Sequence, residues 1–72
     1  MIGDNFKAKR EALGMTQIEL AGHLLVGQSM VAQVEAGIKM PTVCMVKMAA
    51  DLFKCTTDEL IYGEERTGRE SA

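Results

Sequence analysis

The chain has 72 residues, of which 47% are hydrophobic, 25% are charged and 4% are aromatic, and its formal net charge is -2. This length suits one domain with a small core and leaves little room for a large catalytic cleft. Cys44 and Cys55 form no CxxC pair and accompany a single histidine, so we expect reduced thiols in a cytoplasmic protein, without a disulfide framework or zinc site. The sequence shows neither a membrane-spanning nor a secretory pattern.

The first part of the chain predicts two helices. Hydrophobic spacing follows the helical period, which favours an all-α fold. The first helix is expected to end at Gly14, because glycine adopts the left-handed conformation that ends helices. Thr16 and Glu19 then match a capping box that begins the second helix. The buried sides of the two helices are expected to carry Ile2, Phe6, Leu13, Leu20, Ala21 and Leu24.

A third helix is predicted at residues 28–36. It follows a three-residue connection at 25–27, it is ended by Gly37, and it turns Val31 and Val34 toward the core. Two short helices joined by so tight a turn satisfy the sequence cues for a helix-turn-helix.

The C-terminal part predicts two more helices. Pro41 and Thr42 favour the start of a fourth helix, and the Thr-Thr-Asp-Glu segment from Thr56 forms a second capping box. Residues 64–72 hold five charges and no large apolar side chain, so we predict a disordered charged tail after a domain at 1–63. The apolar positions of these helices are Val43, Val46, Ala50, Phe53, Leu60 and Ile61.

The outward face of the third helix carries amide, hydroxyl and methyl groups where a solvated helix normally carries charged groups. A glutamine amide in a DNA major groove both donates to and accepts from adenine. We therefore predict that Gln28, Ser29 and Gln33 contact bases. Gln17 and Lys39 are expected to contact the DNA backbone. A contact between subunits is the alternative, because small residues also suit helix packing.

A structural ion pair is predicted between Arg10 and Glu35. The periodicity places both residues at the margin of the core, where an unpaired carboxylate is costly. A guanidinium can hold a carboxylate with two hydrogen bonds.

Residues 6–61 resemble the Cro/C1-type, XRE-like helix-turn-helix domain of phage repressors and Cro proteins. The resemblance implies a compact five-helix lambda-repressor-like domain, a two-fold dimer and repression by occupying an operator. It also implies that Gln17, Gln28 and Gln33 are contact residues, and it agrees with the ion pair derived above. The matching stretches are KREALGMTQIELA, VEAG with Glu35 and Gly37, Pro41, and TTDELI.

The chain departs from the family pattern at three positions. Leu25 replaces the usual glycine of the turn, so a residue other than glycine is expected at positive φ, or else the turn differs. Gly27 replaces the usual Ser or Thr cap, which predicts a weaker start to the third helix. Lys54 replaces a common helix-ending glycine.

The charge distribution favours a homodimer on DNA. Residues 1–47 carry five basic and four acidic groups, whereas residues 48–72 carry three basic and six acidic groups. With few cations to contact phosphate, tight binding requires two half-sites, about 10 base pairs apart. A dimer surface, with core filling as the equal alternative, is predicted at Met40, Met45, Met48 and Cys55.

The sequence therefore predicts a DNA-binding transcriptional regulator that represses by binding a double-stranded operator as a homodimer. The alternative is a protein-docking module, such as an antitoxin or adaptor, which the sequence pI of 5.2 and the lack of Lys or Arg between Gly22 and Ile38 favour. The chain offers no nucleophile paired with a base, no metal ligand set and no phosphate loop. We predict no enzyme, cofactor, metal or small-molecule substrate.

Overall fold

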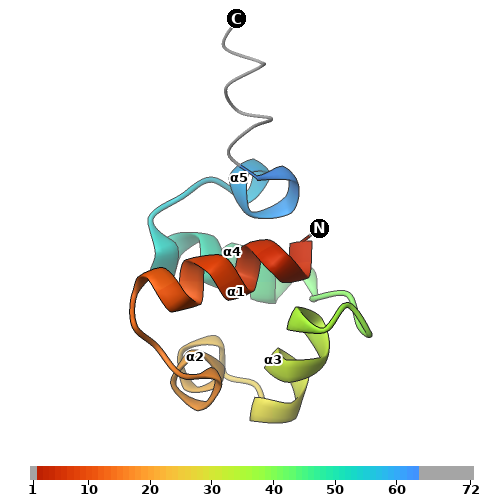
Figure 1. The fold of residues 1–72 in the computed structure, drawn as a ribbon. Helices are drawn as coiled ribbons and strands as arrows, with labels where there is room; N and C mark the ends of the chain where they lie inside the picture. Colours follow the sequence, from red (N-terminus) through yellow and green to blue (C-terminus); the bar gives the residue numbers. More distant parts are fainter. Residues whose placement is uncertain (1, 64–72) are drawn as a thin grey trace, which may run out of the picture.

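A computed structural model describes residues 2–63, in which the regular elements are five α-helices. The all-α prediction is therefore confirmed. In the view of Figure 1, α2 and α3 form the lower end of the molecule, α5 forms the upper end, and α1 and α4 lie between them. The predicted tail at 64–72 lies outside the described residues. The helices are α1 (Ile2–Ala12), α2 (Gln17–Leu24), α3 (Gln28–Glu35), α4 (Val43–Phe53) and α5 (Thr57–Tyr62).

Three threonines begin helices in the way the sequence predicts. The hydroxyl of Thr16 accepts from the backbone N–H of Glu19 at 3.1 Å, and the Glu19 carboxylate accepts from the backbone N–H of Thr16 at 2.8 Å. Thr56 and Glu59 repeat this capping box at the start of α5, with distances of 3.0 and 3.3 Å. Thr42 caps α4 by accepting a backbone hydrogen bond at 3.1 Å. Each cap satisfies a backbone donor that a helix start leaves without a partner.

All five helices contribute to one hydrophobic core. Phe6 lies at its centre on α1, is almost completely buried, and meets the ring of Phe53 edge to face with centroids 6.4 Å apart. Asn5 joins α1 to α5, because its side-chain amide donates to the carbonyl oxygen of Leu60 at 2.8 Å. The buried apolar residues are Phe6, Leu20, Ala21, Leu24, Val31, Val34, Met45, Val46, Ala49, Ala50 and Leu60.

Three residues at predicted apolar helix positions are exposed, and one of them, Ile61, is 37% exposed on α5. Leu13 is 54% exposed, because α1 ends at Ala12 and the chain turns there into Gly14 at φ 68°. Val43 is 76% exposed, because it is the first residue of α4 and the buried face of that helix is out of phase with it. The residues of that face are Met45, Val46, Ala49 and Ala50. The predicted first and fourth helices are correct, but one position on each faces solvent.

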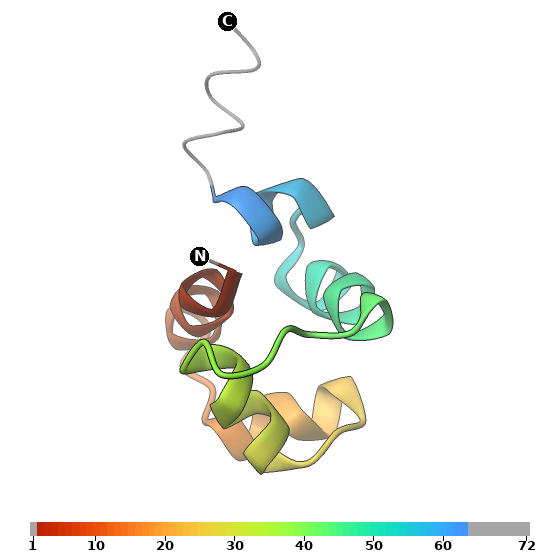
Figure 2. The ribbon, with the colours of Figure 1, turned by 90° about the vertical axis from the view of Figure 1, so that its right-hand side faces the viewer.

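Gly3 permits a close approach between α1 and the end of α3. A Cβ atom at this position would lie 2.2 Å from the backbone oxygen of Val34 and 3.3 Å from that of Glu35. Any side chain here would push the two helices apart. The absence of a side chain therefore sets how closely α1 packs on α3. From α3 the chain continues through the loop that crosses to α4 in Figure 2.

Candidate nucleic-acid interface

The connection between α2 and α3 is a left-handed turn at Leu25. This residue has φ 59° and ψ 40°, and its side chain is 81% exposed. The backbone N–H of Val26 donates to the carbonyl oxygen of Ala21 at 3.0 Å, which closes the end of α2. The positive φ expected at Leu25 is confirmed. The turn retains the conformation that glycine would adopt there, at the conformational cost of a branched side chain.

The first turn of α3 lacks a side-chain cap. Gly27 occupies the N-cap position in an extended conformation, and no side chain accepts from the first backbone N–H groups of the helix. The absence of a side-chain cap is therefore confirmed, and the weaker start of the helix stays a prediction. The first residue, Gln28, is held in another way, because its Nε2 atom donates to Oε1 of Gln17 at 2.8 Å.

Four side chains from three helices form a continuous hydrogen-bond chain, Arg10–Glu35–Gln17–Gln28. Nε and Nη2 of Arg10 donate to the two carboxylate oxygens of Glu35 at 2.7 and 3.1 Å. Nε2 of Gln17 donates to the Oε1 atom of Glu35, also at 3.1 Å. The Arg10 and Glu35 side chains are only 11% and 4% exposed. The predicted ion pair is present, and it extends through Gln17 to the start of α3.

Arg10 also holds the end of α1. Its Nη1 atom donates to the carbonyl oxygen of Met15 at 2.7 Å, in the segment between α1 and α2. The hydrogen bond to Glu35 raises the pKa of Arg10, and the nearby charges of Glu35 and Glu11 act in the same direction, against the effect of burial. The guanidinium therefore stays charged wherever the domain is folded.

The residues predicted to meet DNA differ in accessibility. Gln28 and Ser29 are exposed at the start of α3, and Lys39 is exposed in the loop that follows this helix. Gln33 lies half-buried one turn further along α3. Gln17 is half-buried and bonded to two side chains, an arrangement that the sequence analysis missed because it depends on residues from separate helices.

The predicted dimer surface needs one correction. Met45 is 2% exposed and belongs to the core, because it lies on the inward face of α4. Met48 and Cys55 are half-buried and pack against the core. Met40 is 72% exposed.

Met40 borders an apolar groove of about 500 Å³ that the sequence analysis did not predict. We call it the α4–α5 groove. Val43 and Ile61, two of the predicted apolar helix positions, are 76% and 37% exposed along it. The sequence pattern gives no sign that these two apolar side chains face solvent, so the groove was not predicted. The groove is lined by Ile2, Met40, Pro41, Val43, Val46, Lys47, Thr57 and Ile61.

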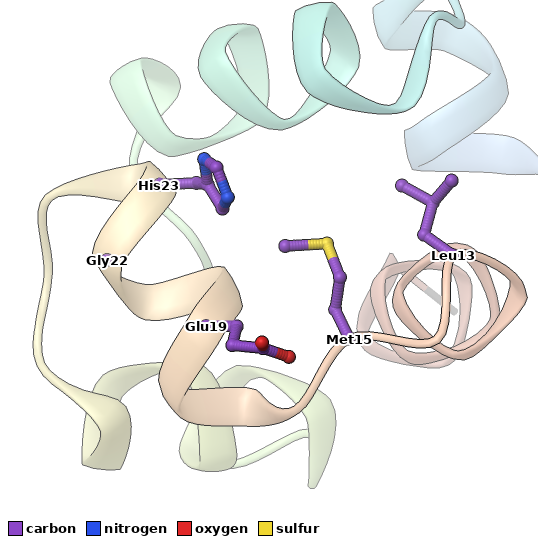
Figure 3. A pocket seen from close by; sticks show the side chains of 5 residues that line it. All are labelled: Leu13, Met15, Glu19, Gly22 and His23. Atoms are coloured by element: carbon purple, nitrogen blue, oxygen red, sulfur yellow. The ribbon is translucent and has the colours of Figure 1, made fainter.

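A second hollow, of about 440 Å³, lies between the end of α1 and α2. Figure 3 shows the Met15 side chain extending toward His23, with Leu13 on its other side. The carboxylate of Glu19 beside it already takes part in the capping box. The lining residues thus do not pair a nucleophile with a base.

Residues 2–63 contain no group of three or more His, Cys, Asp or Glu side chains placed to hold a metal ion. No helix within the same range is both long and apolar enough to cross a bilayer.

The tight α2–α3 pair, with the uncharged side chains of Gln28 and Ser29 exposed at the start of α3, defines a helix-turn-helix protein. The model of the Helix-turn-helix family matches residues 6–60, and the chain belongs to this family. No curated protein sequence matches the chain.

Two solved structures share this fold. One is a crystal structure of the P22 c2 repressor protein in complex with synthetic operator 9T in the presence of Tl+. The two sequences are 22% identical, the match covers 89% of this chain and 97% of the repressor chain, and the TM-score is 0.83. The other is the nuclear magnetic resonance structure of the P22 c2 repressor DNA-binding domain in solution. Its sequence is also 22% identical, the match covers 89% of this chain and 84% of the domain, and the TM-score is 0.82.

Proposed function

We propose that this protein is a sequence-specific DNA-binding repressor that inserts the start of α3 into the major groove of an operator. The observation that carries the proposal is the exposed first turn of α3, where Gln28 and Ser29 offer uncharged hydrogen-bonding groups and Gln28 is held by Gln17. Recognition helices place their base-contacting residues at this end. Membership of the Helix-turn-helix family and a fold shared with an operator-bound repressor support the same function.

Backbone contacts in this proposal come from two places. Lys39 is exposed beyond the end of α3, where its ammonium group contacts phosphate. Gln17 gives one N–H to Glu35 and retains a second one, which donates to phosphate beside the N-terminus of α2. Arg10 is committed to Glu35, so it adds little to phosphate binding.

A second copy of the chain completes the DNA-binding unit. With few cations at the interface, one domain binds a half-site weakly, and two linked domains raise the affinity through simultaneous engagement. The α4–α5 groove supports this assignment, because Met40 and Val43 leave a large apolar surface exposed there. Dimers of this fold class contact half-sites about 10 base pairs apart.

Selection of random DNA duplexes on the purified protein, followed by gel-shift measurements, tests the proposal. Gln28→Ala and Gln33→Ala are expected to weaken binding to the selected duplex about 5- to 150-fold while leaving random DNA binding nearly unchanged. Lys39→Ala is the matched control, since loss of a phosphate contact weakens both kinds of binding alike. Equal losses for the glutamine variants on selected and random DNA would show that they do not contact bases.

The rival function is docking to another protein. It is favoured by the absence of Lys and Arg from residues 22–38, a range that includes the whole of α3. A heparin column separates the two functions, because a DNA-binding protein is retained at low salt and an acidic docking module is not.

A further inference from the structure

The start of α1 connects the two ends of the molecule. Among the helices of residues 2–63, α1 is the one that packs substantially against both α3 and α5. Of these two helices, α2 packs in this way only against α3, and α4 only against α5. Figure 1 shows α1 between α5 at the upper end and α3 at the lower end. The position of α3 relative to α5 therefore depends on the contacts that α1 makes with each.

The contact of α1 with α3 joins backbone to backbone. A Cβ atom at Gly3 would overlap the carbonyl oxygen of Val34 and lie 3.3 Å from that of Glu35. An added methyl group would have to move by about 1 Å before its contact with Val34 became an ordinary one. Arg10 and Glu35 also join these helices, but through side chains that are long enough to follow such a shift. Gly3 therefore sets the separation of the two backbones.

The same turn of α1 reaches the α4–α5 groove. The side-chain amide of Asn5 donates to the carbonyl oxygen of Leu60 at 2.8 Å, which holds α5 against α1. Ile2 lines both the α4–α5 groove and a smaller hollow of about 200 Å³, whose walls include Gly3 and Val34. Residues 2–5 thus contact both the end of α3 and the surface proposed above to bind a second copy.

We propose that residues 2–5 act as a spacer that fixes the position of each recognition helix relative to the dimer surface, and so determine which separation of half-sites the protein accepts. The proposal rests on the dimeric repressor function stated above and adds to it which residues select the spacing. Residues 2–5 are positioning residues, because they act through α3 and α5 without touching DNA. A second domain adds affinity only where geometry lets both domains bind at once.

A shift at Gly3 is large enough to matter on the scale of DNA. Neighbouring base pairs are about 3.4 Å apart along the helix axis. In a two-fold dimer the shift occurs in both subunits, so the two recognition helices of Gly3→Ala would be displaced from each other by up to about 2 Å. This variant should fit the best separation of half-sites less well, and the neighbouring separations comparatively better.

Gel-shift measurements on a series of duplexes test the proposal. The half-site found by selection is placed in pairs separated by about 8 to 13 base pairs from centre to centre, and one duplex carries a single half-site. Wild-type protein is expected to prefer one separation over its neighbours about tenfold or more, and Gly3→Ala to reduce this preference to within about threefold. Binding to the single half-site should change little, because Gln28 lies at the opposite end of α3 from Val34.

A second variant and a matched control accompany Gly3→Ala. Asn5→Ala removes the bond to Leu60 without adding bulk, and it should also reduce the preference for one separation. Gly22→Ala adds the same methyl group on α2, where nothing lies within 4 Å of it, and should keep the full preference. Partial unfolding lowers affinity for every duplex alike, so the ratio between separations reports the position of the helices and not their stability.

The outcomes separate the two proposals. If wild-type protein binds no paired duplex more tightly than the single half-site, both the dimeric repressor function and the spacer fail. If wild-type protein prefers one separation and either Gly3→Ala or Asn5→Ala keeps the full preference, only the spacer fails. An equal loss of preference in Gly22→Ala would also overturn the spacer, because that residue lies outside the contact between α1 and α3.

Discussion

Replacing Arg10 with methionine tests the buried ion pair most directly. Methionine keeps the apolar stem that packs beside the core, so the change removes the charge and its hydrogen bonds with little loss of volume. Glu35, 4% exposed, then loses both guanidinium donors and keeps the one from Gln17. Removing one partner of a buried pair costs about 3–5 kcal/mol, and the remaining bond from Gln17 places the expected loss near 3 kcal/mol.

That loss is large for a domain of this size. Total stability at 0.05–0.15 kcal/mol per residue is about 4–11 kcal/mol for 72 residues. Each kcal/mol lowers the melting temperature of such a domain by about 4–8 °C, so Arg10→Met should melt at least about 12 °C below the wild type. Because the hydrogen bond to Glu35 raises the pKa of Arg10, its contribution is complete below the ordinary pKa of an arginine and is lost only at still higher pH. The Arg10 charge therefore introduces no pH dependence between pH 6 and 10.

Urea denaturation followed by circular dichroism, at one fixed protein concentration, measures the effect. The exposed Lys7 on the same helix supplies a control, since Lys7→Met should change stability by less than about 0.5 kcal/mol. Arg10→Met combined with Glu35→Leu should be less destabilised than the sum of the single changes, because no carboxylate is left buried alone. A loss below about 1 kcal/mol in Arg10→Met, or strict additivity in the double variant, would refute the reasoning.

Three further predictions concern packing, the turn and assembly. Gly3→Ala should lower stability by about 1–3 kcal/mol in thermal melts, because the added Cβ would meet the Val34 carbonyl. Gly22→Ala should raise stability by up to about 1 kcal/mol, because nothing lies within 4 Å of that Cβ. A stability change of the same sign in both variants would contradict the close contact between α1 and α3. Leu25→Gly should raise the free energy of unfolding by about 1 kcal/mol, because glycine adopts the positive φ without strain, and the urea midpoint should rise accordingly. A lower midpoint would show that the turn is unstrained. Val43→Asp should shift a dimer toward monomer in sedimentation equilibrium at unchanged melting behaviour, and an unaltered association constant would remove the α4–α5 groove from the interface.

The helix boundaries and the turn were predictable because their signals are local. Thr16 and Thr56 each precede a glutamate by three residues, and that spacing alone defines a capping box. The positive φ at Leu25 was expected from the resemblance, because Leu25 occupies the position at which the family usually has the glycine of the turn. The Arg10–Glu35 pair was also predictable, because periodicity places both side chains at the edge of a core that tolerates no unpaired charge.

The remaining errors involve properties that local pattern does not determine. The buried face of α4 carries a small apolar pair, Ala49 and Ala50, beside Met45 and Val46, so apolar residues surround most of the helix and periodicity does not give its phase. For this reason Val43 was expected among the apolar positions of the helix, and Met45 was expected in a dimer surface or, equally, as core filling. The bonds of Gln17 escaped prediction because they join α2 to α3 through side chains that meet only after packing.

The carboxylate of Glu35 has two structural roles. It joins α1 to α3 through Arg10, and through Gln17 it also holds Gln28, the first residue of α3. Substitutions that change the operator preference of such a domain therefore differ in what they cost the fold. If Ser29 contacts bases as proposed, substitutions at this residue, which lies outside the chain of bonds, are expected to alter recognition and leave the fold intact. A change at Glu35 removes the bonds to Arg10 and Gln17, so lineages that exchange targets are expected to vary Ser29 and retain Glu35.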